Sequence, residues 1–218
     1  MSGPSRPPEP RETRLGTRDA AGRVRTDPRE RFFGTYPGTV AVVTAAHDGD
    51  RNVLAVGWHA ALSADPPLYG VAIAEARYTH RLGVAAGAFA VQFLPFARSE
   101  AIAGAGSLSR HDGSDKFARL GLVARPGPAT GAPLLHDAYL AYECRLERRV
   151  PTGDHDWWVG AVEAIHHRPE AFDERLLKHA DADPTAIYYG RARYQSLGDG
   201  AVEEFPPDRF RPPSGRSA

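Results

Sequence analysis

Arg77 and Thr79 lie where a predicted strand meets the start of a predicted helix, and their side chains are suited to binding a phosphate group. The first turn of a helix offers free backbone N–H groups and the positive end of the helix dipole. A guanidinium and a hydroxyl beside that turn add charge-assisted hydrogen bonds to an anion. The alternative is that Thr79 only caps the helix and that Arg77 is a solvated surface charge.

A second group of residues has the character of a surface for a flat ligand. From Gly57 to Ser63, small and polar residues gather where a predicted strand ends. Such a stretch leaves backbone N–H and C=O groups open to a planar molecule. The segment Asp65-Pro66-Pro67 then removes two backbone donors and stiffens the next turn. Together these features predict a rigid edge that holds a ring in register.

Several histidines and the single cysteine have competing interpretations. His155 follows Asp154 at a turn, so it is either an active-site group or a turn histidine that pairs with Asp154. We expect His166 and His167 to be solvated at a strand end, and a metal site is not expected because no cysteine accompanies them. Cys144 lies in a predicted strand and is expected to be buried and inert.

The chain lacks other patterns that would point to a different chemistry. The segment 104–109 contains glycines but follows a helix and lacks the third glycine, which excludes a dinucleotide-binding fingerprint. Neither a nucleophilic triad nor a metal-ligand spacing stands out.

The elements that position these residues are mostly strands. Many strands with short turns and few helices predict an antiparallel barrel, whereas a doubly wound sheet would need regular helical crossovers. Residues 78–86 are expected to form a short helix with Thr79 as its N-cap, and 96–120 to be helical and loop-like. The predicted strands cover residues 38–45, 52–57, 68–74, 89–94, 138–150 and 155–167.

Composition limits the partners and the compartment. The 218 residues include 27 Lys+Arg and 27 Asp+Glu, so the net charge is zero and gives no long-range attraction to nucleic acid or to an anionic membrane. No apolar run approaches the roughly 20 residues that span a bilayer. With one cysteine and no signal peptide, we expect a cytoplasmic protein. We expect a flexible tail over 1–30, one domain over 31–198, and a second flexible tail over 199–218.

The order and spacing of the motifs resemble the flavin reductase-like, FMN-binding split-barrel family, and its flavoredoxin-like branch most closely. The resemblance covers residues 34 to 198. Each motif is common by itself, so the shared order along the chain carries the argument. The motifs are Gly57-Trp58-His59, Ser63-Ala64-Asp65-Pro66-Pro67, Arg77-Tyr78-Thr79, Gly87-Ala88-Phe89-Ala90-Val91, Asp115-Lys116-Phe117 and Gly153-Asp154-His155.

The resemblance implies a mainly β fold, a six-stranded antiparallel split barrel that forms a homodimer and binds FMN without a covalent link. It implies that Arg77, Tyr78 and Thr79 hold the phosphate, and that Lys116 adds charge or closes over the site. His155 would lie near the reactive face of the flavin as the catalytic residue. The other implied contacts are Gly57, Trp58, His59 and Ala60 along the ribityl chain and ring, and Ser63 and Asp65 at the polar ring edge.

The resemblance also implies an oxidoreductase. In the first hypothesis NAD(P)H is the co-substrate, and electrons pass through the flavin to oxygen, a partner monooxygenase or another acceptor. In the second, the protein is an electron carrier that keeps its FMN and does not react with nicotinamide. In the third, the barrel is a binding module for another ligand, such as haem or pyridoxal phosphate.

Overall fold

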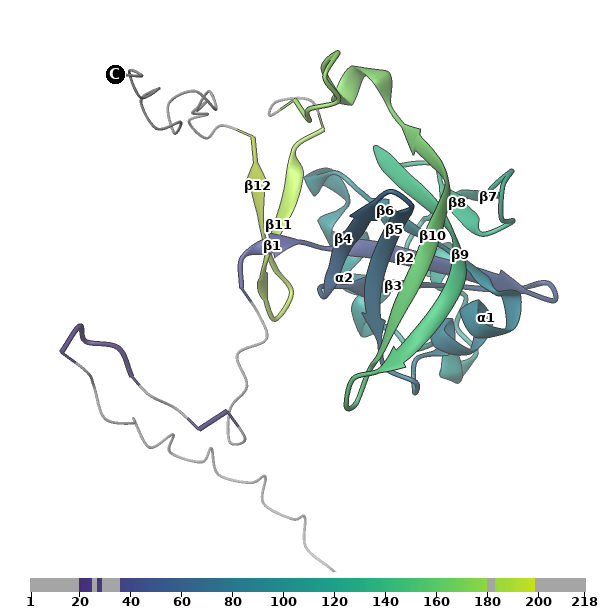
Figure 1. Cartoon of the computed structure of the whole chain (residues 1–218), viewed down its shortest axis with the longest axis horizontal. Coiled ribbons are helices and arrows are strands. Elements are labelled where there is room, and N and C mark those ends of the chain that lie inside the picture. The colour runs from purple at the N-terminus through teal and green to yellow at the C-terminus, as the bar shows by residue number, and fades with distance from the viewer. Residues whose placement is uncertain (1–19, 25–26, 29–35, 180–182, 199–218) are drawn as a thin grey trace, which may run out of the picture. The chain divides into compact units, whose positions relative to one another are not determined.

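The computed structural model describes residues 20–24, 27–28, 36–179 and 183–198 (Figure 1). Contacts divide the chain into Met1–Tyr36 and Pro37–Ala218, and the strands and helices below belong to the second unit. The predicted tails, 1–30 and 199–218, lie outside the described residues apart from 20–24 and 27–28. Within the described ranges, no helix combines the length and the hydropathy needed to cross a membrane.

A seven-stranded antiparallel sheet forms the body of the fold, in the order β3-β2-β6-β9-β10-β5-β4 (Figure 1). It confirms the prediction of a mainly β, antiparallel architecture, with one strand more than the six expected. The strands are β2 (Ala41–His47), β3 (Asp50–Val56), β4 (His59–Ala64), β5 (Pro67–Ile73), β6 (Ala88–Phe93), β9 (Leu140–Pro151) and β10 (Asp156–His167).

The additional strand is β4, which the sequence analysis took for an open segment after a strand. Its residues are small or polar and mostly exposed, so they lack the alternation that marks a half-buried strand. Backbone pairing to β5 holds it in place, with His59 opposite Val71 and Ala60 opposite Gly70. β4 therefore leaves only one of its edges open, because β5 takes the other.

The sheet has apolar side chains on both faces. Along β2, Ala41 and Val43 belong to the interior cluster, whereas Val42 belongs to an outer cluster under the helices. Burial on both faces explains why this segment has a continuous apolar sequence. The interior cluster contains Leu54, Val56, Tyr69, Val71, Ile73, Phe89, Val91, Phe93, Tyr139, Cys144 and Trp158 besides these β2 residues.

Trp158 is completely buried at the centre of this interior. Its indole lies against the ring of Phe89, with 5.2 Å between the centroids, and against the helix at Gly83. A Cβ at Gly83 would lie 2.4 Å from the indole, so only glycine allows this approach. Trp157 faces the other way and covers Gly70 on β5.

One helix packs across the barrel, and the others lie along the outer cluster. Helix α1 (Tyr78–Ala86) has the predicted bounds and packs against β2, β3 and β6. It ends at Gly87, whose φ of 64° is left-handed. The remaining helices are α2 (Ser99–Ser107) and α3 (Lys116–Arg119), with short 3-10 turns η1 (Phe96–Arg98), η2 (Arg110–Asp112) and η3 (Pro169–Ala171).

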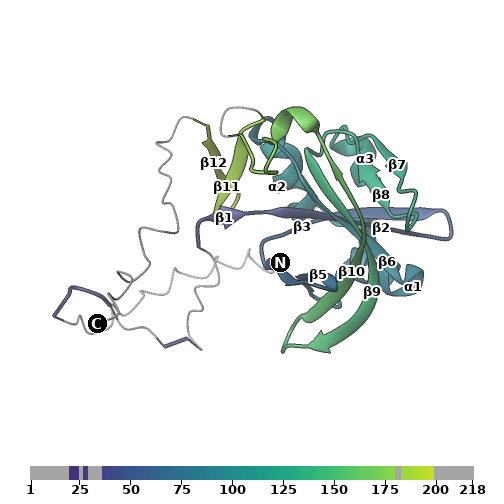
Figure 2. The same cartoon turned by 45° about the horizontal axis from the view of Figure 1, so that its top comes forward.

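Two small sheets complete the fold. The hairpin of β11 (Thr185–Gly190) and β12 (Arg193–Leu197) pairs with β1 (Gly38–Thr39) and lies beside α2 (Figure 2). β7 (Ala124–Pro126) pairs with β8 (Pro133–Leu135). The hairpin therefore returns the end of the described chain to the start of the barrel.

Two predictions about side chains in β9 and β10 have different outcomes. Cys144 is buried as expected, and burial raises the pKa of its thiol to about 12. The expectation of a solvated strand end fits His167, which is exposed, whereas His166 is only partly exposed and its Nε2 lies 2.8 Å from the buried carboxylate of Glu143. Burial opposes ionisation of Glu143, but hydrogen bonds from His166 and Thr130 hold its pKa below the ordinary value. A sequence pattern does not reveal this pair because the register of β9 against β10 creates it.

Gly160→Ala tests the packing of the interior. The new Cβ would lie 2.6 Å from the Phe89 ring and 2.8 Å from the Cys144 Cβ, so the core must shift. We expect the free energy of unfolding to fall by about 1–3 kcal/mol in urea titrations. Adding Phe89→Leu should recover part of this loss by making room. A double variant whose loss equals the sum of the two single losses would contradict the proposed contact.

Candidate functional site

The start of α1 opens onto a small cavity of about 40 Å³, called here the α1 hollow. Arg77 occupies the N-cap position just before the helix, and its side chain makes no capping hydrogen bond to the helix N–H groups. Thr79 is the second residue of the helix and is fully buried, so the predicted capping role is wrong. The hollow is lined by Asn52, Leu54, Ala76, Arg77, Tyr78, Thr79, Leu108, Ser109, Arg110, His111 and Lys116.

Asn52 and Thr79 form a hydrogen-bonded pair inside the hollow. The Asn52 side-chain N–H donates to the Thr79 hydroxyl oxygen over 3.0 Å. The Thr79 hydroxyl donates to no other group in the described part of the chain, so its proton remains available. Asn52 Oδ1 is buried without a hydrogen-bond partner. A buried acceptor without a donor costs about 1–3 kcal/mol, so this atom points to a partner that a ligand supplies.

Lys116 places an ammonium group at the same site from the start of α3. Its side chain is buried, and its Nζ donates to the carbonyl oxygens of Val53 (3.0 Å) and Ala105 (2.9 Å). Two of its three N–H donors are thereby used, which leaves one for a ligand. Burial, together with the nearby Arg77 guanidinium, lowers the pKa of Lys116 to about 8.

Arg77 supplies the second positive charge. It is exposed, and its guanidinium forms neither a hydrogen bond nor an ion pair with any residue that the structure describes. The two cations repel each other in the protein alone, since Arg77 contributes to the lowered pKa of Lys116. With an open helix N-terminus and the Thr79 hydroxyl beside them, they form a site for a compact anion.

The free edge of β3 leads away from this hollow. Lys116 binds the Val53 carbonyl, so that carbonyl points away from the paired strand β2. Backbone direction alternates along a strand, so Ala55 presents its N–H and C=O to the same free edge.

The edge reaches a larger cavity of about 360 Å³, called here the β3 cavity. It is lined by Val40, Ala55, Gly57, Ile102, Ala103, Gly106, Ser107, Tyr188, Arg191, Ala192 and Tyr194. The sequence analysis missed the hairpin residues Tyr188, Arg191 and Tyr194, because a hairpin at the end of the domain carries no local sign of what it covers. Ser107 lines the β3 cavity, and the next two residues, Leu108 and Ser109, line the α1 hollow.

Trp58, in the connection between β3 and β4, packs against His155. Their ring centroids are 5.1 Å apart with an angle of 55° between the planes. The tip of the β9–β10 hairpin brings His155 to this position. The alternative interpretation also describes a real contact, since His155 Nδ1 lies 2.7 Å from Asp154 Oδ1. That carboxylate fixes the imidazole and leaves Nε2 free to bind another group.

The side chain of His59 uses both of its ring nitrogens for contacts within the barrel. Its Nε2 lies 3.2 Å from the Thr39 carbonyl, which can only accept, so Nε2 carries the proton. Its Nδ1 therefore accepts from the Tyr69 hydroxyl at 2.8 Å. Burial lowers the pKa of His59 and favours this neutral form. Only the backbone of His59 remains for a ligand.

The remaining predicted residues lie along β4 and its turn. Ala60 and Ser63 are on the strand, and Asp65 is exposed in the turn that contains a cis peptide bond to Pro66. Neither cavity includes them among its lining residues. The structure thus gathers Arg77, Tyr78, Thr79 and Lys116 around the α1 hollow and places Gly57 at the β3 cavity. Ala60, Ser63 and Asp65 lie apart from both cavities, on the opposite edge strand β4 and the turn that follows it.

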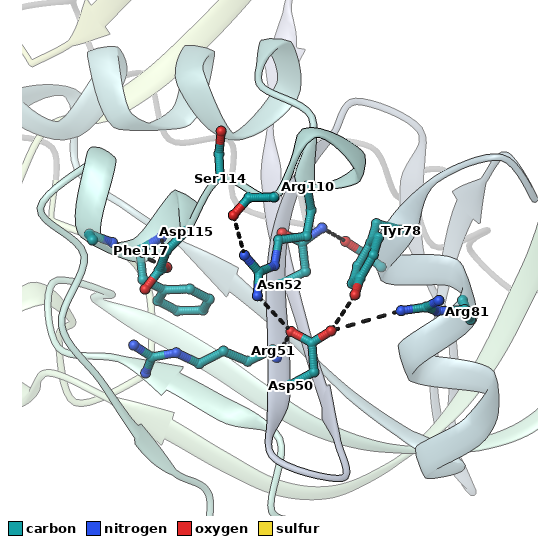
Figure 3. Close-up of polar contacts among 12 residues, drawn as sticks. Asp50, Arg51, Asn52, Tyr78, Arg81, Arg110, Ser114, Asp115 and Phe117 are labelled. Atoms are coloured by element: carbon teal, nitrogen blue, oxygen red, sulfur yellow. Dashed lines mark hydrogen bonds and ion pairs between the residues drawn. The ribbon is translucent and has the colours of Figure 1, made fainter.

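An ionic network closes the end of the α1 hollow (Figure 3). The Asp50 carboxylate accepts from the Tyr78 hydroxyl and, over 3.0 Å, from Arg110. Arg81 lies 3.8 Å away on the same helix as Tyr78. Burial opposes ionisation of Asp50, but hydrogen bonds from Tyr78, Arg110 and the Arg51 backbone hold its pKa below the ordinary value. Of these residues, sequence reasoning singled out only Tyr78; Asp50, Arg81 and Arg110 belong to none of the motifs and were missed.

Comparison with known proteins identifies the family. Residues 33–198 match the family described as the flavin reductase like domain. The chain belongs to this family. An NADH-dependent FMN reductase, AsuE2, from Streptomyces nodosus subsp. asukaensis is 38% identical over 158 residues, which cover 71% of this chain and 82% of the relative.

Two other similar proteins differ in how much of their length is shared. An uncharacterised protein from Aeropyrum pernix is 35% identical over 131 residues, 60% of this chain, and the chain spans only 50% of that relative's length. A solved FMN-binding protein from Thermus thermophilus, with bound 1-cyclohex-2-enone, superposes with a TM-score of 0.73. It is 32% identical and covers 83% of this chain and 97% of its own.

His59→Phe tests the structural role of the imidazole. The change removes the donor to Thr39 and the acceptor of the buried Tyr69 hydroxyl, so the free energy of unfolding should fall by about 1–3 kcal/mol. Tyr69→Phe removes the same hydroxyl, and the double variant should therefore lose less than the sum of the single losses. Thermal or urea unfolding measures all three. Strictly additive losses would show that the two side chains do not interact.

Proposed function

We propose that this protein is an FMN-binding flavin reductase that takes electrons from NAD(P)H and passes them to oxygen, a partner monooxygenase or another acceptor. The single observation that carries the proposal is the α1 hollow, where the cations of Arg77 and Lys116 and the uncapped first turn of α1 lie beside the buried Thr79 hydroxyl. The name of the AsuE2 relative supports the reaction, since it describes an NADH-dependent FMN reductase. Exposed Trp58, Leu62 and Val150 favour a homodimer that covers them.

The dimensions of the β3 edge support FMN as the ligand. Five residues of extended strand separate Asn52 from Gly57, roughly 17 Å at about 3.4 Å per residue. A three-ring flavin with a five-carbon chain and a phosphate needs a site of this length. The phosphate would lie in the α1 hollow, the chain along the backbone of Val53 and Ala55, and the ring near Gly57 and the β3 cavity.

The residues present fit each part of that ligand. A phosphate dianion would take the remaining N–H of Lys116, the Arg77 guanidinium and the Thr79 hydroxyl. The ribityl hydroxyls would supply the donor that Asn52 Oδ1 lacks. The flat ring would lie over small side chains at Ala55 and Gly57, where a larger side chain would fill the space.

The protein's own residues would bind, orient and shield rather than react. When bound, FMN supplies the hydride acceptor and returns the electrons to the next acceptor. His155, fixed by Asp154 and packed against Trp58, would form a wall for the nicotinamide and orient it. We propose His155 as the catalytic residue in this sense, and His59, Ala60, Ser63 and Asp65 as backbone or edge contacts of the ring.

Anaerobic stopped-flow mixing tests the reaction. Protein loaded with FMN should lose its visible flavin absorbance after mixing with NADH or NADPH, because the nicotinamide donates a hydride. If FMN binds but neither nucleotide bleaches it, the protein is an electron carrier and the reductase proposal fails. If the purified protein binds no flavin, a binding module for another ligand replaces both interpretations. His155→Ala should slow the bleaching while FMN affinity is unchanged.

The lowered pKa of Lys116 predicts how FMN affinity depends on pH. The free protein loses the Lys116 proton above about pH 8, and a bound phosphate favours the charged form. FMN affinity should therefore be flat below that value and fall above it by up to about tenfold per pH unit. The phosphate itself is already doubly charged there, since its second pKa is about 6. Fluorescence titration of the flavin measures the curve.

Riboflavin and Arg77→Ala are the controls for this prediction. Riboflavin lacks the phosphate, so its affinity should not change over the same pH range. Arg77→Ala should weaken FMN binding roughly ten- to hundredfold. It should also move the fall in affinity to higher pH, because Arg77 lowers the pKa of Lys116. An equal pH dependence for riboflavin and FMN would remove Lys116 from the phosphate site.

A further inference from the structure

The α1 hollow is closed at one end by the segment 108–112, called here the clasp. Asp50 begins β3, two residues before Asn52, so the order along the strand is Gly57, Asn52 and then Asp50. A ligand that follows this order would therefore point its phosphate toward Asp50, which Figure 3 shows bound to Tyr78 and Arg110. Whatever lies beside Asp50 determines whether a ligand can continue beyond its first phosphate.

Arg110 ties the clasp to β3. Its guanidinium donates to Asp50 Oδ1 over 3.0 Å and to the Gly113 carbonyl over 3.0 Å. Both side chains of the ion pair are only about a quarter exposed, at 25% for Arg110 and 28% for Asp50. Arg110 Nε is buried and has no hydrogen-bond partner within the described chain. The guanidinium thus fills the space next to Asp50 instead of extending into solvent.

His111 and Tyr78 tie the clasp to the start of α1. His111 Nε2 donates to the Ala76 carbonyl over 3.0 Å. The His111 ring packs edge-on against Tyr78, with 5.2 Å between centroids and 74° between planes. Tyr78 in turn donates to Asp50. The clasp is therefore attached on both sides of the groove, and it leaves a hollow of only about 40 Å³.

We propose that the clasp makes the site selective for FMN over FAD. A terminal phosphate ends inside the hollow, where Arg77, Thr79 and Lys116 can surround it. The second phosphate and the adenosine of FAD would have to pass through the positions of Arg110, His111 and Tyr78. This inference rests on the proposed flavin site, and it names Arg110 and His111 as the residues that determine specificity.

Affinities for three flavins test the inference. Riboflavin, FMN and FAD are each titrated into the wild-type protein and into the double variant Arg110→Ala, His111→Ala. We expect the wild type to bind FMN at least about tenfold more tightly than FAD. The double variant should bind FAD at least about fivefold more tightly than the wild type does, with riboflavin affinity unchanged. Arg125→Ala is the control, because this exposed residue lies on β7 and lines neither the α1 hollow nor the β3 cavity.

The outcomes separate the inference from the proposed function. Equal affinities of the wild type for FMN and FAD would overturn the inference but leave the flavin site intact. A double variant whose FAD affinity stays the same or falls would also overturn it, even if the FMN affinity drops. If the double variant does not fold, Asp50→Ala removes the acceptor that holds Arg110 and is judged by the same gain in FAD affinity. If the wild type binds none of the three flavins, the proposed function fails together with the inference.

Discussion

A buried ammonium group organises this site. Taking a charged lysine out of water is unfavourable unless its donors are satisfied, and Lys116 uses the carbonyls of Val53 and Ala105 for two of them. The Val53 carbonyl is available because β3 is an edge strand and has no neighbour on that side. These two hydrogen bonds therefore hold α2, the start of α3 and the edge of β3 together around the Lys116 ammonium group. The compensation is incomplete, as the lowered pKa shows, and an anion would complete it.

The start of α1 likewise leaves polar groups without partners in the protein alone. A serine, threonine or aspartate at the N-cap would satisfy the first N–H groups of the helix, yet Arg77 stands there without capping. Thr79 lies two residues after the N-cap position and instead pairs with Asn52. The uncapped N–H groups and the unpartnered Asn52 Oδ1 reduce the stability of the protein alone. They are groups that a phosphate and a polyhydroxyl chain can satisfy.

The split in the barrel determines where the proposed flavin site lies. β3 and β4 are consecutive in the chain but occupy opposite ends of the sheet order, so the connection through Gly57 and Trp58 crosses the gap between two edges. A sheet closes into a complete barrel when its two edge strands pair with each other, and here the edge strands β3 and β4 do not pair. The long β9–β10 hairpin crosses the same region and delivers His155 to Trp58.

The sequence by itself determined the strand-rich class, the bounds of α1 and the burial of Cys144, and its motifs led to Arg77, Thr79 and Lys116 as proposed phosphate contacts. These depend on local patterns: apolar runs, turn residues, and charged groups beside a helix start. It did not reveal β4, because an exposed edge strand is held by backbone hydrogen bonds and needs no apolar alternation.

Only the tertiary structure decided which groups meet. The pairing of Glu143 with His166 depends on the register of β9 and β10, and the position of Asp50 against Arg110 depends on how a distant segment crosses β3. The same holds for His59, which has the residue type of a ligand contact but has both ring nitrogens bound within the barrel. Side-chain partners that are far apart in sequence follow from the packing of whole elements, and no local pattern encodes them.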